Sequence, residues 1–146
     1  PWDFCEENNE TVDIVKSFRS DNVKYIYSAP HTFFYDKGKG DVKPMLEYAG
    51  DDLSHMLIAD NMNHTKHCRY IVNPPGVDAT IHQHVGVGEG EVDFDTLFKT
   101  LRDTGFATRS YKVGGEPIIA ASLFGYPEKM KVQAVETREL IERELL

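Results

Sequence analysis

Residues 53–59, Leu53-Ser54-His55-Met56-Leu57-Ile58-Ala59, decide the fold class. This stretch is almost entirely apolar, which is typical of a strand that is buried on both faces of a parallel sheet. Residues 23–27 and 117–124 are also rich in apolar and β-branched side chains, so each predicts a further strand. The sequence therefore predicts three strands of the kind found in α/β proteins.

Helices are predicted between these strands, where apolar side chains recur at helical spacing or an Asp and a Gly mark the two ends. They cover residues 9–19, 42–49, 94–103 and 127–146. Because strands that alternate with helices pair in parallel through right-handed crossovers, we expect one parallel sheet. Residues 28–40 and 60–92 are predicted as loops after the first two strands, and the length of the second loop suggests a function.

This order of elements predicts an α/β fold, and the chain is too short to form a whole (β/α)₈ barrel. Three parallel strands alone leave open edges and a thin core. Residues 1–146 therefore fit the C-terminal part of one barrel domain better than a complete domain, and a small three-layer α/β sandwich is the alternative. We expect the earlier strands to come from a missing N-terminal half-barrel or from a homo-oligomer.

Composition narrows the classes of function. The net charge of -8 at pH 7 argues against a broad nucleic-acid surface. No apolar run approaches the ~20 residues that span a bilayer, and the first residues lack the basic and apolar regions of a signal peptide. Cys5 and Cys68 form no C-x-x-C pair, so we expect free thiols. These features predict a cytoplasmic protein without a nucleic-acid or membrane partner.

Histidines gather in the predicted loops that follow the strands, which is where (β/α)₈ barrels carry their chemistry. His82 and His84 face the same side if the backbone is extended, and His84 is the candidate metal ligand. Asp60, directly after the second strand, is a candidate catalytic group, as are His64 and His82. Solvated loop histidines and a loop-starting Asp60 are the structural alternatives.

Three further residues are candidates for substrate binding. His31 follows the first strand, Arg69 can hold an anionic group through its guanidinium, and Glu89 lies in the glycine-rich stretch after His84. A half-buried structural role for His31 and a surface position for Arg69 agree equally well with the sequence. His55 lies in the middle of a strand, where a hydrogen-bonded core histidine is expected.

Residues 84–94, His84-Val85-Gly86-Val87-Gly88-Glu89-Gly90-Glu91-Val92-Asp93-Phe94, resemble the glycine-rich segment before the penultimate helix of xylose isomerase-like barrels. Residues 53–60 are similar to that family's strand of the form H-V-H-x-x-D, and residues 69–76 and 81–84 resemble its inositol-catabolism branch. The resemblance covers nearly the whole chain. It implies a partial TIM barrel of the sugar phosphate isomerase/epimerase family, with parallel strands six to eight and their flanking helices.

The same resemblance implies a divalent metal such as Mn, Zn, Co or Mg, held by Glu, Asp, His and Glu on strands five to eight, that assists proton transfer. The usual ligands are not matched, because the first would precede Pro1 and the other positions hold Ser28, Leu57 and Ser122. Other groups would then hold the metal, with His82, His84 and Asp60 as the best candidates, or the metal has been lost. His31 matches a position that usually contacts substrate.

We therefore expect a sugar or cyclitol isomerase or epimerase that moves a proton next to a carbonyl with the help of a metal. The alternative is a non-catalytic or incomplete sugar-binding barrel fragment that needs a partner for activity. A protein-interaction module is a third interpretation, which explains open sheet edges but not the gathered histidines.

Overall fold

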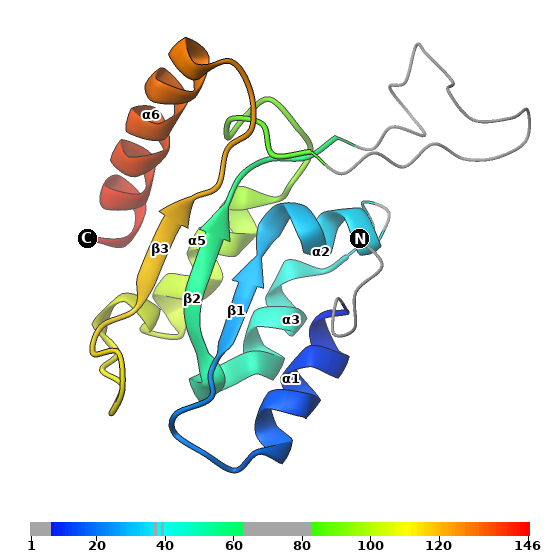
Figure 1. The fold of residues 1–146 in the computed structure, drawn as a ribbon, viewed down its shortest axis with the longest axis vertical. Coiled ribbons are helices and arrows are strands. Elements are labelled where there is room, and N and C mark those ends of the chain that lie inside the picture. The colour runs from blue at the N-terminus through cyan, green and yellow to red at the C-terminus, as the bar shows by residue number, and fades with distance from the viewer. Residues whose placement is uncertain (1–6, 37, 39, 63–82) are drawn as a thin grey trace, which may run out of the picture.

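The computed structural model of the chain describes residues 7–36, 38, 40–62 and 83–146. Its strands are β1 (Tyr25–Ser28), β2 (Leu53–Ile58) and β3 (Ile118–Ala121), and they form one sheet in the order β1-β2-β3. Both pairings are parallel, as predicted, and the three arrows in Figure 1 point the same way. The bounds of β1 and β3 differ from the predicted strands at residues 23–27 and 117–124. The reason is that pairing with β2 begins only at Tyr25 in β1 and covers only four residues of β3.

Four helices accompany the strands in the described residues as the spacing predicts: α1 (Asn8–Ser17), α3 (Val42–Ala49), α5 (Phe94–Asp103) and α6 (Pro127–Leu145). Asp41 and Asp93 cap α3 and α5 by accepting backbone N–H groups at 3.2 and 3.0 Å, and both of these helices have the predicted bounds. Single 3₁₀ turns, η1 (Gly50–Asp52) and η2 (Phe106–Thr108), follow them. Across the part of the chain that the structure describes, no helix combines the length and apolarity needed to cross a membrane.

The loop predicted for residues 28–40 is wrong in its first half, which forms the short helix α2 (Ala29–Tyr35). Pro30 lies in its first turn, where a proline's fixed φ angle favours a helix and its missing N–H costs nothing. The segment is only seven residues long, so helical spacing could not reveal it. As a result His31 lies on a helix that begins directly at the end of β1.

The core lies between the sheet and one layer of helices. Tyr27 and Met56 point from the sheet toward the helices and are 1% and 0% exposed. They pack in one cluster with fully buried side chains from the helical layer: Val12, Leu97, Leu101 and Phe106. Figure 1 shows α5 behind β2, α3 beside and partly behind β1, α1 farther out on the side of β1, and α6 beside β3. Burial of each large apolar side chain contributes about 1.5–3 kcal/mol, so this cluster sets the orientation of the strands.

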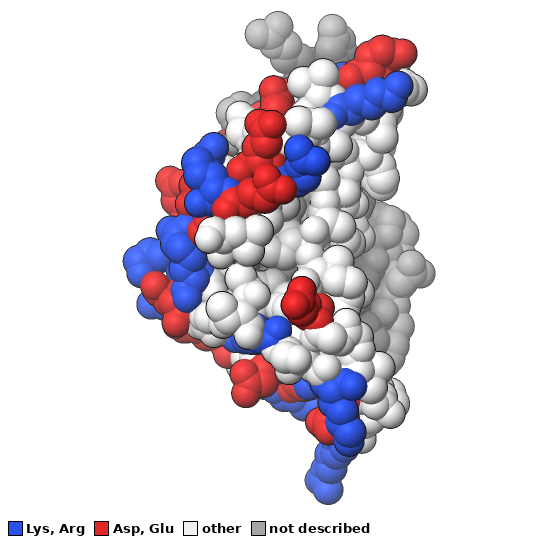
Figure 2. All heavy atoms as spheres, turned by 90° about the vertical axis from the view of Figure 1, so that its left-hand side faces the viewer, with Lys and Arg blue, Asp and Glu red and all other residues white. Residues whose placement is uncertain are grey.

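The opposite face of the sheet carries no helix in the described residues. Register places Ile26, His55 and Ile118 in one row across the strands, and Ile26 and Ile118 are each 51% exposed. Figure 2 shows charged side chains mainly toward the helical side, whereas the remaining described surface in that view is mostly uncharged. A three-layer sandwich needs helices on both faces, so the one-sided layer favours a barrel segment.

Candidate functional site

The candidate site lies where the three strands end. β1 leads directly into α2 with His31, β2 leads into Asp60, and β3 leads into Ser122. His84 reaches this edge through backbone hydrogen bonds between its neighbour Val85 and Asp60, at 2.8 and 3.1 Å. Because parallel strands bring their carboxyl ends to one edge, side chains that are far apart in sequence meet there.

His84 is buried and has a defined hydrogen bond on one side of its ring. It is 3% exposed, and its Nδ1 lies 2.7 Å from the carbonyl oxygen and 3.0 Å from the hydroxyl of Ser122. A carbonyl can only accept, so Nδ1 carries the proton and Nε2 carries the lone pair. Burial lowers the pKa of His84 below its ordinary value, and the bond to Ser122 opposes that shift. His84 is therefore a neutral imidazole near pH 7.

Two rings surround this imidazole. Phe124 stacks on it with ring centres 4.3 Å apart and planes 15° from parallel, and Phe124 itself is 66% exposed. His31 meets it edge-on, with ring centres 5.2 Å apart and planes at 73°. The structure thus brings together two of the predicted site residues, His31 and His84, beside an aromatic ring that extends into solvent. Such a mixture of aromatic surface and few polar groups is typical of small-molecule sites.

Asp60, predicted as a catalytic group, lies at the same edge with its carboxylate fully engaged. Oδ2 accepts the backbone N–H groups of Gly88 and Gly90 at 2.9 Å, and Oδ1 accepts those of Asn61 and Val92 at 2.9 and 3.0 Å. Asp60 is 1% exposed. Four bonds fill the acceptor sites of a carboxylate, so these contacts account for Asp60 as a residue that organises the glycine-rich loop.

Glu89, predicted to bind substrate, faces α6. Its carboxylate lies 2.8 Å from the ammonium group of Lys129, and this hydrogen bond is the main reason that the pKa of Glu89 is lowered. The pair is exposed enough that its contribution to stability is small. The contacts of Glu89 therefore tie the loop to α6, and its role toward substrate stays a prediction.

The remaining predicted site residues, His64, His82 and Arg69, lie outside the described residues, as do Cys5 and Cys68. His55 is described, and its Nδ1 lies 2.7 Å from the hydroxyl of Ser54, as expected for a hydrogen-bonded histidine within a strand. It is therefore a useful comparison for the two histidines at the strand ends.

The residues present at the expected metal positions do not fit a divalent ion. Ser28, Leu57 and Ser122 offer two neutral hydroxyls and an alkyl group, whereas such ions require carboxylates or imidazoles. Both oxygens of Asp60 are bonded to backbone N–H groups, which leaves this carboxylate little capacity to bind a metal. Within residues 7–36, 38, 40–62 and 83–146, no group of three or more His, Cys, Asp or Glu side chains is placed to hold a metal.

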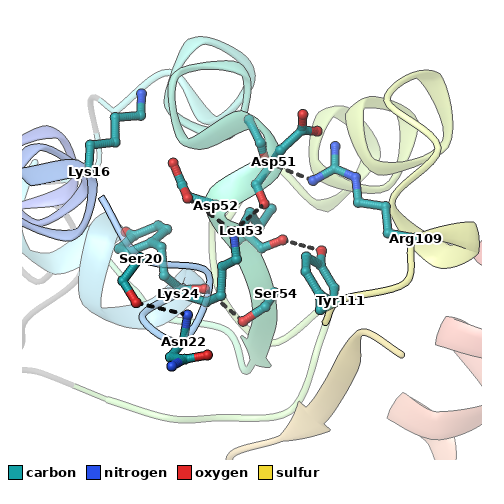
Figure 3. Close-up of polar contacts among 12 residues, drawn as sticks. Lys16, Ser20, Asn22, Lys24, Asp51, Asp52, Leu53, Ser54, Arg109 and Tyr111 are labelled. Carbon is teal, nitrogen blue, oxygen red and sulfur yellow. Dashed lines mark hydrogen bonds and ion pairs between the residues drawn. The ribbon is translucent and has the colours of Figure 1, made fainter. Parts of the chain in front are cut away.

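A second polar cluster lies at the opposite end of the sheet. It borders a shallow cavity of about 380 Å³ lined by Lys24, Arg109 and Tyr111 among others. Figure 3 shows these side chains turned toward the turn before β2: Lys24 bonds Asp52 at 3.2 Å, and Tyr111 donates to the Leu53 carbonyl. Each group has a protein partner, so this cluster closes the amino end of the sheet rather than offering a site.

Sequence reasoning assigned no positive role to Ser122 and did not single out Phe124 or Asn61. The only available signal was their position directly after predicted strands, which is where barrel sites form. Their contacts are with residues far away in the chain, so no local motif could identify them.

Comparison with known proteins gives one family for this sequence. A family model described as xylose isomerase-like TIM barrel matches residues 1–116. The matched part contains β1, β2, α5 and the glycine-rich loop, and it ends just before β3. No curated protein matches the chain.

Proposed function

Because the chain belongs to the xylose isomerase-like TIM barrel family, we propose that it acts on a sugar or cyclitol by moving a proton at the carbon next to a carbonyl. The observation that carries this proposal is the pair of imidazoles at the ends of parallel strands. Burial keeps His84 neutral, Ser122 sets its tautomer, and His31 lies against it with ring centres 5.2 Å apart. A neutral imidazole is the side chain best suited to proton transfer near pH 7.

In the proposed reaction, Nε2 of His84 takes the proton from the carbon beside the carbonyl. The electron pair of that C–H bond forms the carbon–carbon double bond of an enediolate, while the carbonyl π electrons move to oxygen. An isomer forms when the hydroxyl on the first carbon loses its proton to His31 and becomes the new carbonyl, while the former carbonyl carbon receives a proton. Return of the proton to the opposite face of the first carbon gives an epimer. His31 is the proposed partner that delivers a proton to the substrate oxygen.

Ser28 is the proposed donor to a substrate hydroxyl or carbonyl oxygen. Its Oγ is buried at the end of β1 and makes no hydrogen bond within the described residues. A buried polar atom without a partner is uncommon in folded proteins and is costly unless a ligand or water satisfies it. Catalytic roles for His64 and His82, anion binding by Arg69 and participation of a divalent metal stay predictions, and no step above depends on them.

A specific observation favours a second candidate, in which the chain is an incomplete barrel that needs partner strands. The open sheet face exposes 51% of both Ile26 and Ile118. Members of a closed barrel fill this space with inward-facing side chains from all strands. We therefore propose that further parallel strands cover this face in the active protein, and that β1 to β3 correspond to strands six to eight.

Solvent exchange tests the proposed activity directly. The chain is incubated in D₂O with a panel of aldoses, ketoses and inososes, and NMR follows deuterium entering at the carbon next to the carbonyl. His84→Gln and His31→Gln are each expected to lose about 100-fold or more of the exchange rate. His55→Gln is the matched control, because it removes an imidazole from the same sheet away from the strand ends.

Retention of exchange by His84→Gln at the wild-type rate would contradict the proposed base. The same panel is repeated with a half-barrel of the family that supplies strands one to five added. Exchange that appears only after this addition supports the incomplete-barrel candidate. Absence of exchange under both conditions contradicts an isomerase or epimerase activity on these substrates.

A further inference from the structure

The dipeptide Asp60-Asn61 joins the segments that carry both imidazoles. Asp60 holds the loop after His84, because its backbone pairs with Val85 and its carboxylate accepts the N–H groups of Gly88, Gly90 and Val92. The loop therefore wraps around one buried carboxylate. Its path beside the site depends on that carboxylate together with the single bridge between Asp60 and Val85.

Asn61 makes the corresponding contact on the other side. Its Nδ2 donates to the carbonyl oxygen of Pro30 at 3.0 Å, directly before His31, and its Oδ1 accepts the N–H of Met62 at 2.9 Å. Its backbone carbonyl accepts the N–H of Glu91 at 2.8 Å, which links it to the same loop as Asp60. Asn61 is 0% exposed, so water does not replace these bonds.

We infer that Asp60 and Asn61 are positioning residues that set the distance and angle between His31 and His84. The dipeptide follows β2, the central strand, so its place is determined by the most buried element of the sheet. Asn61 connects the dipeptide to the end of β1 by its hydrogen bond to Pro30. The glycine-rich loop and His84 connect it to the end of β3, because the backbone carbonyl of His84 accepts the N–H of Phe124 at 2.8 Å.

This inference rests on the proposed function, because it assumes that both imidazoles take part in the reaction. Its test reads the state of an imidazole and does not require turnover. NMR of the full chain labelled with ¹⁵N reports the tautomer of each imidazole. In the wild-type chain we expect His84 to show a proton on Nδ1, in agreement with its bond to Ser122. In Asp60→Asn we expect the signal of the Nδ1–H tautomer of His84 to disappear, or to weaken while the signal of the Nε2–H tautomer appears.

A merely structural role would lower stability without changing the imidazole. Leu101→Ala supplies this comparison, because Leu101 is a fully buried residue of α5 and its truncation destabilises the fold by leaving a cavity. We expect Leu101→Ala to leave the His84 tautomer and kcat unchanged at temperatures well below unfolding. For Asp60→Asn we expect kcat to fall about 100-fold, because small displacements of catalytic groups have effects of that size.

Glycine substitutions provide a second test if Asp60→Asn does not fold. A Cβ at Gly90 would lie 2.4 Å from Oδ1 of Asp60 and 2.4 Å from the carbonyl oxygen of Asn61, whereas a Cβ at Gly125 would meet only Cγ of Met130, at 3.8 Å. Gly90→Ala should therefore disturb the tautomer signal of His84, and Gly125→Ala, at a glycine outside the loop that Asp60 holds, should not. Unchanged His84 signals in both Asp60→Asn and Gly90→Ala would overturn the inference, whatever the outcome of the exchange assay.

Discussion

Replacing Asp60 with Asn is expected to cost a large part of the stability of this protein. Each carboxylate oxygen of Asp60 accepts two backbone N–H groups: Oδ2 those of Gly88 and Gly90, and Oδ1 those of Asn61 and Val92. An amide has only one oxygen. In either orientation its NH₂ group therefore faces two N–H groups that have lost their acceptor.

The magnitude follows from burial at this position. A buried donor that loses its acceptor costs about 1–3 kcal/mol, and water cannot easily replace the acceptor because Asp60 is only 1% exposed. Two such donors give about 4 kcal/mol, within a range of about 2–6. Since whole domains are stable by about 5–15 kcal/mol, the variant should unfold at a much lower urea concentration.

Urea unfolding followed by far-UV circular dichroism measures this loss as a shift in midpoint at unchanged slope. Asp93→Asn is the matched control, because Asp93 also accepts a backbone N–H, that of Thr96 at 3.0 Å, but lies exposed at the start of α5. Asn caps helices as well as Asp does, so the control should change stability by less than about 0.5 kcal/mol. A loss below about 1 kcal/mol for Asp60→Asn would refute the reasoning.

Two other predictions concern single side chains. The pKa of His84 is lowered on folding from its ordinary 6.5, so the unfolded chain binds more protons and stability should fall as the pH drops below about 6.5. In His84→Gln this loss of stability at low pH should be smaller. Stability curves that run parallel over pH for the two proteins would contradict this prediction. Arg109 donates to the carbonyl oxygens of Gly50 at 2.7 Å and Thr104 at 3.2 Å, where α3 and α5 end. Arg109→Met should therefore lower the free energy of unfolding in urea by about 2 kcal/mol. The control, Arg138→Met at an exposed ion pair, should lower it by only about 0–0.5 kcal/mol. Equal losses in the two variants would argue against the capping role of Arg109.

Local signals determined much of the fold. The bounds of α3 and α5 could be predicted because an Asp caps each helix and a Gly lies just after the end of each. The apolar run of β2 predicted a strand buried on both faces, of which the structure buries four of the six residues, and the alternation of elements predicted the parallel pairing that is observed. The helix caps are contacts between residues that are close in the chain, and the parallel pairing follows from the order of the elements, so both leave a signal in the sequence.

The helix α2 and the lengths of β1 and β3 could not be predicted in this way. α2 has too few residues to show helical spacing, and the strand ends are set by which backbone groups of β2 remain to be paired. These features depend on neighbours that come together only when the sheet forms.

For the site, histidines and a carboxylate that follow the strands are visible in the chain order, and the resemblance pointed to the family that the comparison confirms. The contacts of each of these residues emerge only when the strands come together. The tertiary structure placed His84 against Ser122, 38 positions away, and filled the oxygens of Asp60 with N–H groups from 28 to 32 positions away as well as from its neighbour Asn61. The tautomer of an imidazole and the availability of a carboxylate depend on such partners, and folding alone brings these partners together.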